Sequence, residues 1–490
     1  MDFLDPQKQK AHARRLIAGY ILIGMVLLLA TVILLYQAFG YGIDRHGRVF
    51  QNGLVFISSL PDNAEVYVNG ERQSSTTNTR LVLPAGQYVF ELKREGYRAW
   101  KRAITVEGST LQRFDYPLLF ADNPETALVK QYAAPGLATQ SLDKRWLLVQ
   151  SDTANSFELF DINADNPVPS TLAIPTEVLS NGETNGWQEV EWSKDNRRLV
   201  LKRLFTQDGK QTSEYILVDR ENANASVNLS VRLGFTPTVL QLRDKAHDQY
   251  YAFDQPNGLL FTATLERPTP QPYLDKVLAF QSDGADSVLY ATSQDASPGK
   301  TLVRVRQGDD HYTIRQVEAA AAPYMLDIAR YDGDWYVAAG ASAEDRVYVY
   351  KNPVDALKSD SGDVLVPVHI LKAARPTYAV FSPGSRFILA EGGQDFSVFD
   401  VKNNNGYSFQ LDDQLSSDPG HATWADEYHL TFVTADGQII IVDYDGTNRQ
   451  VLAAARAGTT PFFTDNYRRL YALTATNSLD RTELRAPRDR

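Results

Sequence analysis

The 490-residue chain contains no cysteine and only three methionines. Without cysteine there is no disulfide, no thiolate nucleophile and no Cys-ligated zinc, so the fold is held by its core alone. Basic residues are fewer than acidic ones, 49 against 60, and the net charge is −11. The chain therefore lacks the cationic footprint that nucleic-acid binding requires, and we expect no nucleic-acid partner.

Hydrophobic residues make up 43% of the chain, and aromatic residues 11%, with 25 Tyr and 22 Phe. That is enough apolar material for a sizeable core, which excludes a disordered chain. Aromatic residues are enriched in strands, so the composition favours an all-β fold.

One segment differs from this pattern, because Leu16 to Phe39 is a run of 24 residues without a charge. A helix of this length spans the ~30 Å hydrocarbon layer of a membrane. A cleaved signal peptide would have a shorter apolar stretch, about 7–15 residues, before a small-residue cleavage site. This run ends instead near bulky Tyr36, Phe39 and Tyr41, which suit the membrane interface. We predict a retained transmembrane helix over residues 16–39.

Basic residues on the two sides of this run predict its orientation. Lys8, Lys10, Arg14 and Arg15 precede the run, and a weaker cluster around Arg45 follows it. By the positive-inside rule, residues 1–15 form a cytoplasmic tail. We therefore expect a single-pass protein of the cytoplasmic membrane, with everything after about residue 45 outside the cytoplasm.

Residues 50–120 are expected to form a small β-sandwich. An apolar stretch, 54–57, precedes turn residues, and Ala64 to Val68 alternates with period two before Asn69-Gly70, a strong hairpin signal. The segment resembles a PEGA domain, a small β-sandwich of bacterial and archaeal surface proteins. The residues that carry the resemblance are Ser59, Pro61, Ala64, Val66, Tyr67, Val68, Gly70, Gly86, Tyr88, Gly96 and Tyr97.

Two departures from the PEGA pattern are visible. The signature tetrapeptide is Pro61-Asp62-Asn63-Ala64 instead of Pro-Glu-Gly-Ala, and residues 74–79 replace the usual Gly-x-Thr-Pro. The resemblance covers about 70 residues and brings no catalytic residue with it.

From residue 125 to residue 486 one unit recurs: a polar turn, a basic residue, an apolar strand, a hairpin and a second strand ending near Asp. The equivalent turn positions are Lys144, Asp195, His247, Asp286, Asp332, Pro383, Asp426 and Asn466. The seven steps from Lys144 to Asn466 average 46 residues, which is the length of a four-stranded propeller blade. The repeat predicts a β-propeller with eight blades, with seven as the alternative.

Several copies resemble the propeller repeat of TolB-type proteins. The first half of that repeat is matched by Trp192-Ser193 and by Phe381-Ser382-Pro383-Gly384, and the second half by residues 439–446, which end in Asp443-Tyr444-Asp445-Gly446. No Trp-Asp dipeptide occurs, which disfavours a WD repeat.

Motifs that carry chemistry are few. Asp443-x-Asp445-Gly446 lacks the later ligands of a calcium loop and is better explained as a hairpin turn. Ser382-Pro383-Gly384-Ser385 is a turn and not a nucleophile elbow. No two histidines have the spacing of a metal site; they are His12, His46, His247, His311, His369, His421 and His429.

Three polar insertions at expected hairpin tips are the remaining candidates for recognition, residues 152–156, 207–211 and 293–299. We predict no catalytic residue, metal or cofactor, and leave the ligand-binding residues unassigned. The sequence indicates a membrane-anchored surface protein, not an enzyme, that binds or scaffolds an envelope component, a cell-wall glycan or a protein, through its propeller. The alternative is a glycan-processing enzyme with its active site in the propeller.

Overall fold

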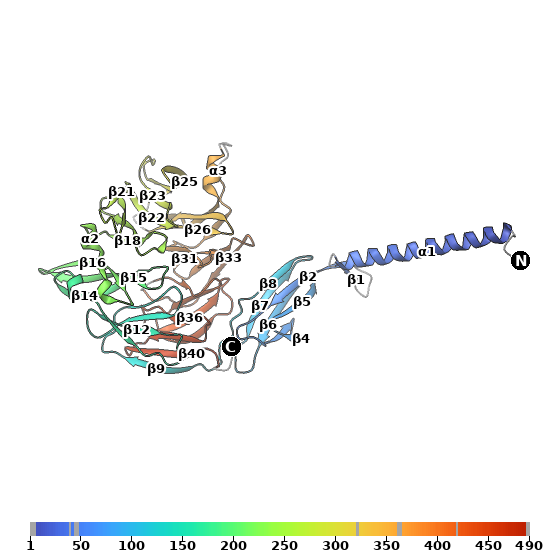
Figure 1. Ribbon diagram of the computed structural model, residues 1–490, viewed down its shortest axis with the longest axis horizontal. Coiled ribbons are helices and arrows are strands. Elements are labelled where there is room, and N and C mark those ends of the chain that lie inside the picture. The colour runs from blue at the N-terminus through green and yellow to red at the C-terminus, as the bar shows by residue number, and fades with distance from the viewer. Residues whose placement is uncertain are drawn as a thin grey trace. The chain divides into compact units, whose positions relative to one another are not determined.

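The computed structural model describes residues 6–38, 41–43, 49–319, 323–359, 365–417 and 420–486. It contains one long helix, α1 (Pro6–Ala38), and is otherwise built almost entirely of strands (Figure 1). Two compact units divide the chain between Asp122 and Asn123. Because each unit has its own core, they are described separately.

From Leu16 onward, helix α1 is apolar around its whole circumference. Its segment His12–Tyr36 has a mean hydropathy of 2.7, and none of its most apolar stretch is buried against protein. A helix with apolar side chains on every face and no protein cover needs an apolar surrounding. By length and composition α1 can cross a membrane, as the uncharged run predicts. The predicted segment boundary at Phe39 lies just outside the described residues.

The first unit also holds two four-stranded sheets. One contains β1 (Tyr41–Ile43), β2 (Val49–Ile57), β5 (Thr79–Pro84) and β8 (Leu111–Phe114), and the other β4 (Glu71–Thr76), β3 (Glu65–Val68), β6 (Gly86–Lys93) and β7 (Trp100–Val106). Alternate residues such as Val55, Phe90 and Trp100 are buried in the core, and the residues between them face outward.

The predicted hairpin forms at Asn69-Gly70, which joins β3 to β4. Both residues have a positive φ, 51° and 84°, as a two-residue type I′ turn requires.

The second unit contains eight four-stranded antiparallel sheets, which are the blades of a β-propeller. Blades 1–4 consist of β10 (Ala138–Gln140), β11 (Trp146–Gln150), β12 (Ser156–Asp161), β13 (Ser170–Ala173); β14 (Glu183–Trp192), β15 (Arg198–Gln207), β16 (Lys210–Asp219), β17 (Val227–Asn228); β18 (Val239–Leu242), β19 (Gln249–Asp254), β20 (Leu259–Thr264), β21 (Gln271–Leu274); β22 (Val277–Asp283), β23 (Ser287–Thr292), β24 (Lys300–Gln307) and β25 (Asp310–Glu318).

Blades 5–8 consist of β26 (Tyr324–Tyr331), β27 (Asp334–Ala341), β28 (Arg346–Lys351), β29 (His369–Lys372); β30 (Tyr378–Phe381), β31 (Phe387–Gly392), β32 (Asp395–Asp400), β33 (Asn405–Gln410); β34 (Thr423–Trp424), β35 (His429–Val433), β36 (Gln438–Asp443), β37 (Gln450–Ala454); β38 (Phe462–Phe463), β39 (Arg469–Leu473), β40 (Ser478–Glu483) and β9 (Glu125–Gln131). Short helices between strands are η1 (Thr176–Val178), η2 (Ala223–Ala225), α2 (Leu229–Leu233), η3 (Arg243–Lys245), η4 (Ser342–Glu344) and α3 (Pro353–Lys358).

The ring is closed by the pairing of a strand from the start of the unit with a strand from its end. β9, the first strand of the unit, pairs with β40, the last strand, so blade 8 draws on both ends of the repeat array (Figure 1). First strands of several consecutive blades contact one another, as β14 does β18, β22 does β26 and β26 does β30. The eight-bladed prediction is confirmed, and all eight marked positions lie in the turn between the first and second strands of a blade.

The repeated basic residue and the repeated Asp are ion-pair partners within a blade. Arg145 Nη2 lies 2.8 Å from Asp161 Oδ2 in blade 1, and Arg386 Nη2 lies 2.8 Å from Asp400 Oδ2 in blade 6. Blade 5 carries the pair in reverse, with Asp334 on β27 and Lys351 on β28, 2.7 Å apart. This pair ties the second strand of a blade to its third strand.

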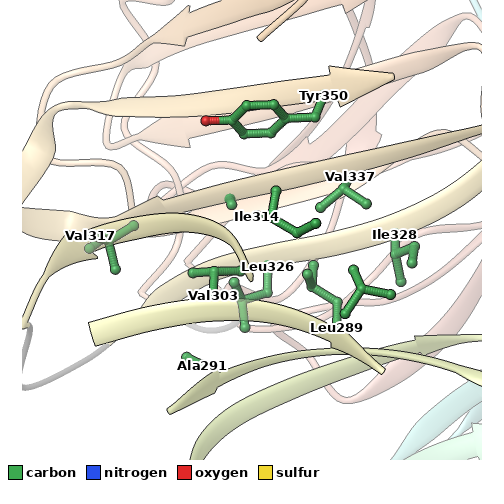
Figure 2. Packing of buried hydrophobic residues seen from close by; sticks show 12 residues of the cluster. Leu289, Ala291, Val303, Ile314, Val317, Leu326, Ile328, Val337 and Tyr350 are labelled. Atoms are coloured by element: carbon green, nitrogen blue, oxygen red, sulfur yellow. The ribbon is translucent and has the colours of Figure 1, made fainter. Parts of the chain in front are cut away.

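The core of the propeller lies between blades. Figure 2 shows the cluster between blades 4 and 5, where side chains such as Val303 of β24 and Leu326 of β26 meet. Both faces of a blade are therefore expected to be apolar, and the second strands β23, β31 and β39 are buried at every position.

Candidate functional site

The three polar insertions singled out in the sequence lie at one face of the ring. Residues 152–156, 207–211 and 293–299 each include the link between the second and third strands of a blade. The eight marked turns link first to second strands and therefore lie at the opposite face, because neighbouring strands run antiparallel. Of the three insertions, 293–299 also contributes a side chain, Gln294, to a cleft described below.

Asp443 and Asp445 lie at the hairpin between β36 and β37 and contact neighbours within it. Asp443 Oδ2 accepts a hydrogen bond from Asn448 Nδ2 at 2.8 Å, and Asp445 Oδ1 accepts from Thr447 Oγ1 at 2.6 Å. Both carboxylates thus serve the turn. Among the residues that the structure describes, no group of three or more His, Asp or Glu is placed to hold a metal ion.

His429 is the most buried histidine and lies between two acids. Its Nδ1 is 2.8 Å from Asp426 Oδ1, and its Nε2 is 3.5 Å from Asp443 Oδ1. Burial alone would lower the pKa of His429, but the two carboxylates outweigh it and raise the pKa. In blade 7 this imidazole is the register partner of Asp443, a position that Trp146 holds opposite Asp161 in blade 1 and Phe387 opposite Asp400 in blade 6. His46 falls outside the described residues.

A group of carboxyls lines the inner part of the ring and joins one blade to the next. Asp327 on β26 accepts a hydrogen bond from the backbone nitrogen of Phe381 at 2.7 Å, in blade 6. Glu391 on β31 likewise accepts from the nitrogen of Ala422, at 2.8 Å, in the segment leading into blade 7. Burial raises the pKa of Asp327 to about 7 and that of Glu391 to about 8.

Tyr378 and His421 complete this inner group. Their rings are stacked with centroids 3.8 Å apart. Burial raises the pKa of Tyr378, and the nearby charges of Asp327 and Glu391 raise it further. The Oε1 atom of Glu391 is buried and has no hydrogen-bond partner among the described residues. We refer to Asp327, Tyr378, Glu391 and His421 as the inner carboxyl group.

A cleft of about 550 Å³ opens between blades 3 and 4. One side is formed by β20 and β21 of blade 3, and the other by β23, β24 and β25 of blade 4. We call it the blade 3–4 cleft. Its lining includes Tyr273, Tyr290, Gln294, Arg304, His311 and Thr313.

Strand alternation explains why blade 4 has one apolar face and one polar face. Val303 and Val305 point toward blade 5 and belong to its core cluster. Arg304 on the same strand therefore points to the opposite face, toward blade 3. On β25 Ile314 packs toward blade 5 and Thr313 lines the cleft in the same way.

Two largely covered arginines lie at this interface, and one of them, Arg304, lines the cleft. The Arg304 side chain is 16% exposed and donates from Nε to Thr313 Oγ1 at 3.1 Å and from Nη2 to Asp295 at 3.3 Å. The Arg306 guanidinium lies 3.8 Å from the centroid of the Tyr273 ring, a cation–π contact. Arg304 also lies close enough to the Tyr290 hydroxyl for a side-chain hydrogen bond.

His311 and Tyr290 form a polar pair in the same cleft. The Tyr290 hydroxyl lies 2.8 Å from His311 Nδ1, and Tyr290 is 3% exposed. Burial lowers the pKa of His311, and Arg306 and Arg304 lower it further, so the ring is neutral at pH 7. A neutral imidazole whose Nδ1 accepts the hydrogen bond of the tyrosine hydroxyl carries its proton at Nε2, and that N–H can donate a hydrogen bond to a ligand.

A second hollow, of about 590 Å³, lies between blades 5 and 6. Its lining includes Lys372, Asp395, Phe396 and Phe409. Phe396 and Phe409 stack on each other at 5.2 Å, and Lys372 is exposed. This hollow offers no histidine or arginine to a ligand among its lining residues, so the blade 3–4 cleft is the richer site chemically.

Sequence reasoning missed the blade 3–4 cleft, although a signal was present. Residues 303–306 read Val-Arg-Val-Arg, which alternates apolar and charged. This pattern is common in a sheet with one solvent-exposed face, but both faces of a propeller blade are covered by the neighbouring blades. Within a propeller, alternating arginines therefore mark an interface that is polar.

Comparison with known protein families gives a match within the first unit. The PEGA domain family model matches residues 52–119, which confirms the resemblance seen in the sequence. A search of curated proteins gave no match.

Solved structures that resemble the chain include BamB from Moraxella catarrhalis, with 12% identity and a TM-score of 0.42, covering 73% of this chain and 98% of BamB. The computationally designed Ika8 protein is 12% identical with a TM-score of 0.40, covering 72% of this chain and all of Ika8. An oligogalacturonate lyase in complex with manganese is 11% identical with a TM-score of 0.39, covering 73% and 99%. Likenesses this loose assign neither an activity nor a ligand to the chain, and the propeller rests on its strand pairing.

Proposed function

We propose that the protein is a membrane-anchored surface protein that binds an envelope component through its propeller, with the blade 3–4 cleft as the point of recognition. The observation that carries the proposal is the polar lining of the blade 3–4 cleft, in contrast to the apolar interface between blades 4 and 5. The largely covered Arg304 and Arg306 cost stability there, because their charged groups lose water. Sites that break the local folding rules are where function is expected.

The recognised group is a saccharide of the cell wall. Sugars present many hydroxyls, each both donor and acceptor, around an apolar ring face. The cleft matches them with the Gln294 amide, the Arg304 guanidinium and the His311 imidazole next to aromatic and proline surfaces. The ring faces the cell wall if α1 anchors the chain with residues 1–15 in the cytoplasm, as the flanking basic residues favour.

Binding is tested with the full chain in nanodiscs and purified cell-wall glycan fragments, by titration calorimetry. We expect Arg304→Ala and His311→Ala each to weaken binding by about tenfold or more, the cost of one or two lost hydrogen bonds. Arg145→Ala in blade 1 is the matched control, because it also removes an arginine that pairs with Asp, and it should leave affinity unchanged. Equal affinity in all variants would show that the cleft is not the recognition site. Binding to envelope proteins but not to glycan fragments would show that the ligand is a protein.

Orientation is tested separately, by adding protease to intact spheroplasts. Digestion of the large domain is the expected result. Protection until the cells are lysed would reverse the topology.

A second candidate function rests on the inner carboxyl group. Two carboxyls with raised pKa beside a tyrosine are the kind of arrangement that general acid catalysis of glycoside cleavage uses. Both carboxyls accept backbone hydrogen bonds between blades, which supports a structural role. Turnover of glycan fragments that is lost in Glu391→Gln but kept in Arg304→Ala would favour the enzyme over the binding protein.

A further inference from the structure

The outer face of one PEGA-domain sheet carries an apolar row that is open to solvent. Val82 on β5 and Leu111 on β8 are 62% and 58% exposed. Both are register partners of Leu54 on the central strand β2. Three aliphatic side chains therefore form one row across the sheet, on the face opposite to the buried Val55 and Ile57.

The next row on the same face is cationic. Arg80 on β5 and Arg113 on β8 are the register partners of Phe56, and the Arg113 guanidinium lies 5.2 Å from the centroid of the Phe56 ring. Both arginines are exposed, and neither is paired with a carboxylate among the described residues. Arginines flanking an aliphatic row are unusual on a chain whose net charge is −11.

The outer face of the second sheet in the same domain has the opposite character. There Arg72 Nη2 lies 2.6 Å from Glu65 Oε1, and Lys93 Nζ lies 3.0 Å from Glu91 Oε2. Arg72 and Lys93 are thus neutralised within the sheet. The contrast between the two faces shows that open arginines are not a general property of this domain.

The open face is close along the chain to the apolar helix. β1, which starts at Tyr41, belongs to the same sheet as β2, β5 and β8, and α1 ends at Ala38. Three residues span at most about 11 Å. A sheet held this near to the end of a membrane helix stays within reach of the lipid headgroups.

We infer that this sheet face, Leu54, Phe56, Arg80, Val82, Leu111 and Arg113, docks on the surface of the membrane that α1 enters, with anionic lipid headgroups as its partner. The inference rests on α1 being a membrane anchor. Val82 and Leu111 enter the headgroup region, and Arg80 and Arg113 contact lipid phosphates, which attract basic side chains near an anionic surface. The docking holds the PEGA domain against the membrane.

The absence of cysteine makes the test direct, because one introduced cysteine carries one label. Leu111→Cys and Val89→Cys, the latter on β6 of the second sheet, are labelled with an environment-sensitive fluorophore in the full chain. Each is reconstituted into vesicles of phosphatidylcholine, with or without roughly a third phosphatidylglycerol. Quenching by nitroxide lipids and the emission wavelength report contact with the bilayer.

We expect the label at 111, but not the label at 89, to shift to the blue and be quenched several-fold more in anionic vesicles. Arg80→Glu combined with Arg113→Glu should abolish this difference while α1 keeps the protein in the vesicle. A label at 111 that stays as wet as the label at 89 in both vesicles overturns the docking. A label at 111 that becomes buried only when envelope proteins are added also overturns the docking. Equal quenching of this label in vesicles with and without anionic lipid overturns the role of the arginines.

Discussion

Blade 4 contacts its two neighbours in opposite ways. Toward blade 5 it contributes to a cluster of twelve buried apolar residues, shown in Figure 2. Toward blade 3 the corresponding cluster has seven, and the outer part of the interface opens into the blade 3–4 cleft. Because the same strands make both interfaces, the difference comes from side chains alone.

The comparison shows that one interface between blades can form a binding cleft without any change in the arrangement of the strands. Leu289 and Tyr290 are neighbours on β23, yet Leu289 packs against blade 5 and Tyr290 faces the cleft. The stability lost on the polar side is supplied by the apolar side and by closure of the ring. Breaking each of these features should have effects of different size.

Ring closure carries the largest effect, because both interfaces exist only in a closed ring. Deleting residues from 458 onward removes β38, β39 and β40, leaves β9 without its partner and uncovers faces of blades 1 and 7. We expect no soluble folded propeller from this deletion. Removing only residues 487–490, which follow the last strand, is the control. A monomeric truncation with an unchanged melting transition would contradict a closed ring.

Neighbouring residues on β23 separate the two interfaces. Leu289→Ala creates a cavity in the blade 4–5 core and should lower the free energy of unfolding by about 2–5 kcal/mol. Tyr290→Phe removes only a hydroxyl beside His311 and should cost about 1 kcal/mol. Denaturant unfolding of both variants measures the difference. Equal losses would show that the two faces of blade 4 are packed alike.

The inner carboxyl group adds a pH dependence. The folded-state pKa of Glu391, about 8, is above its usual 4.5, so the folded state holds this proton more tightly than the unfolded state. Its contribution is complete below about pH 4.5 and is lost as the pH rises through 8. Asp327 acts in the same direction. Between pH 5 and pH 9 the free energy of unfolding should therefore fall by on the order of a few kcal/mol.

The variant Glu391→Gln checks the source of that loss, since an amide does not ionise. Its unfolding free energy should change less with pH than that of the unchanged chain. Asp208→Asn, in an exposed hairpin tip, is the control and should preserve the slope. If the unfolding free energy of all three proteins changed with pH by the same amount, the titrating group would not be Glu391.

The smallest effect is expected at His311. Its folded-state pKa is lowered, so its contribution to stability is complete above about pH 6.5 and is lost as the pH falls through the lowered value. NMR titration of the His311 ring should give a midpoint below 6.5. Arg306→Ala should raise that midpoint, and an unchanged midpoint would show that the arginine does not act on the ring.

The helix, the PEGA domain and the number of blades could be predicted from the sequence because each is written in local patterns. An uncharged run, the Asn69-Gly70 turn and the recurring basic residue and Asp depend on residues close along the chain. The pairing of β9 with β40 could not be seen in the same way, because it joins the two ends of the array.

The candidate sites were hidden for a similar reason. Asp327 and Glu391 both act on Tyr378 only because blades 5 and 6 are neighbours on the ring, and no motif links them. The alternation around Arg304 was visible, but it has meaning only when blade 3 is known to cover that face. Contacts between blades therefore need the closed ring before they can be identified.

Hydrogen–deuterium exchange of the full chain in nanodiscs, with and without cell-wall glycan fragments, tests the central claim most directly. The account predicts slower exchange on β24, β25 and the 293–299 hairpin when glycan is present, with β26 to β28 across the apolar interface unchanged. The protection should disappear in Arg304→Ala. Protection confined to other blades, or none with glycan that demonstrably binds, would contradict recognition at the blade 3–4 cleft.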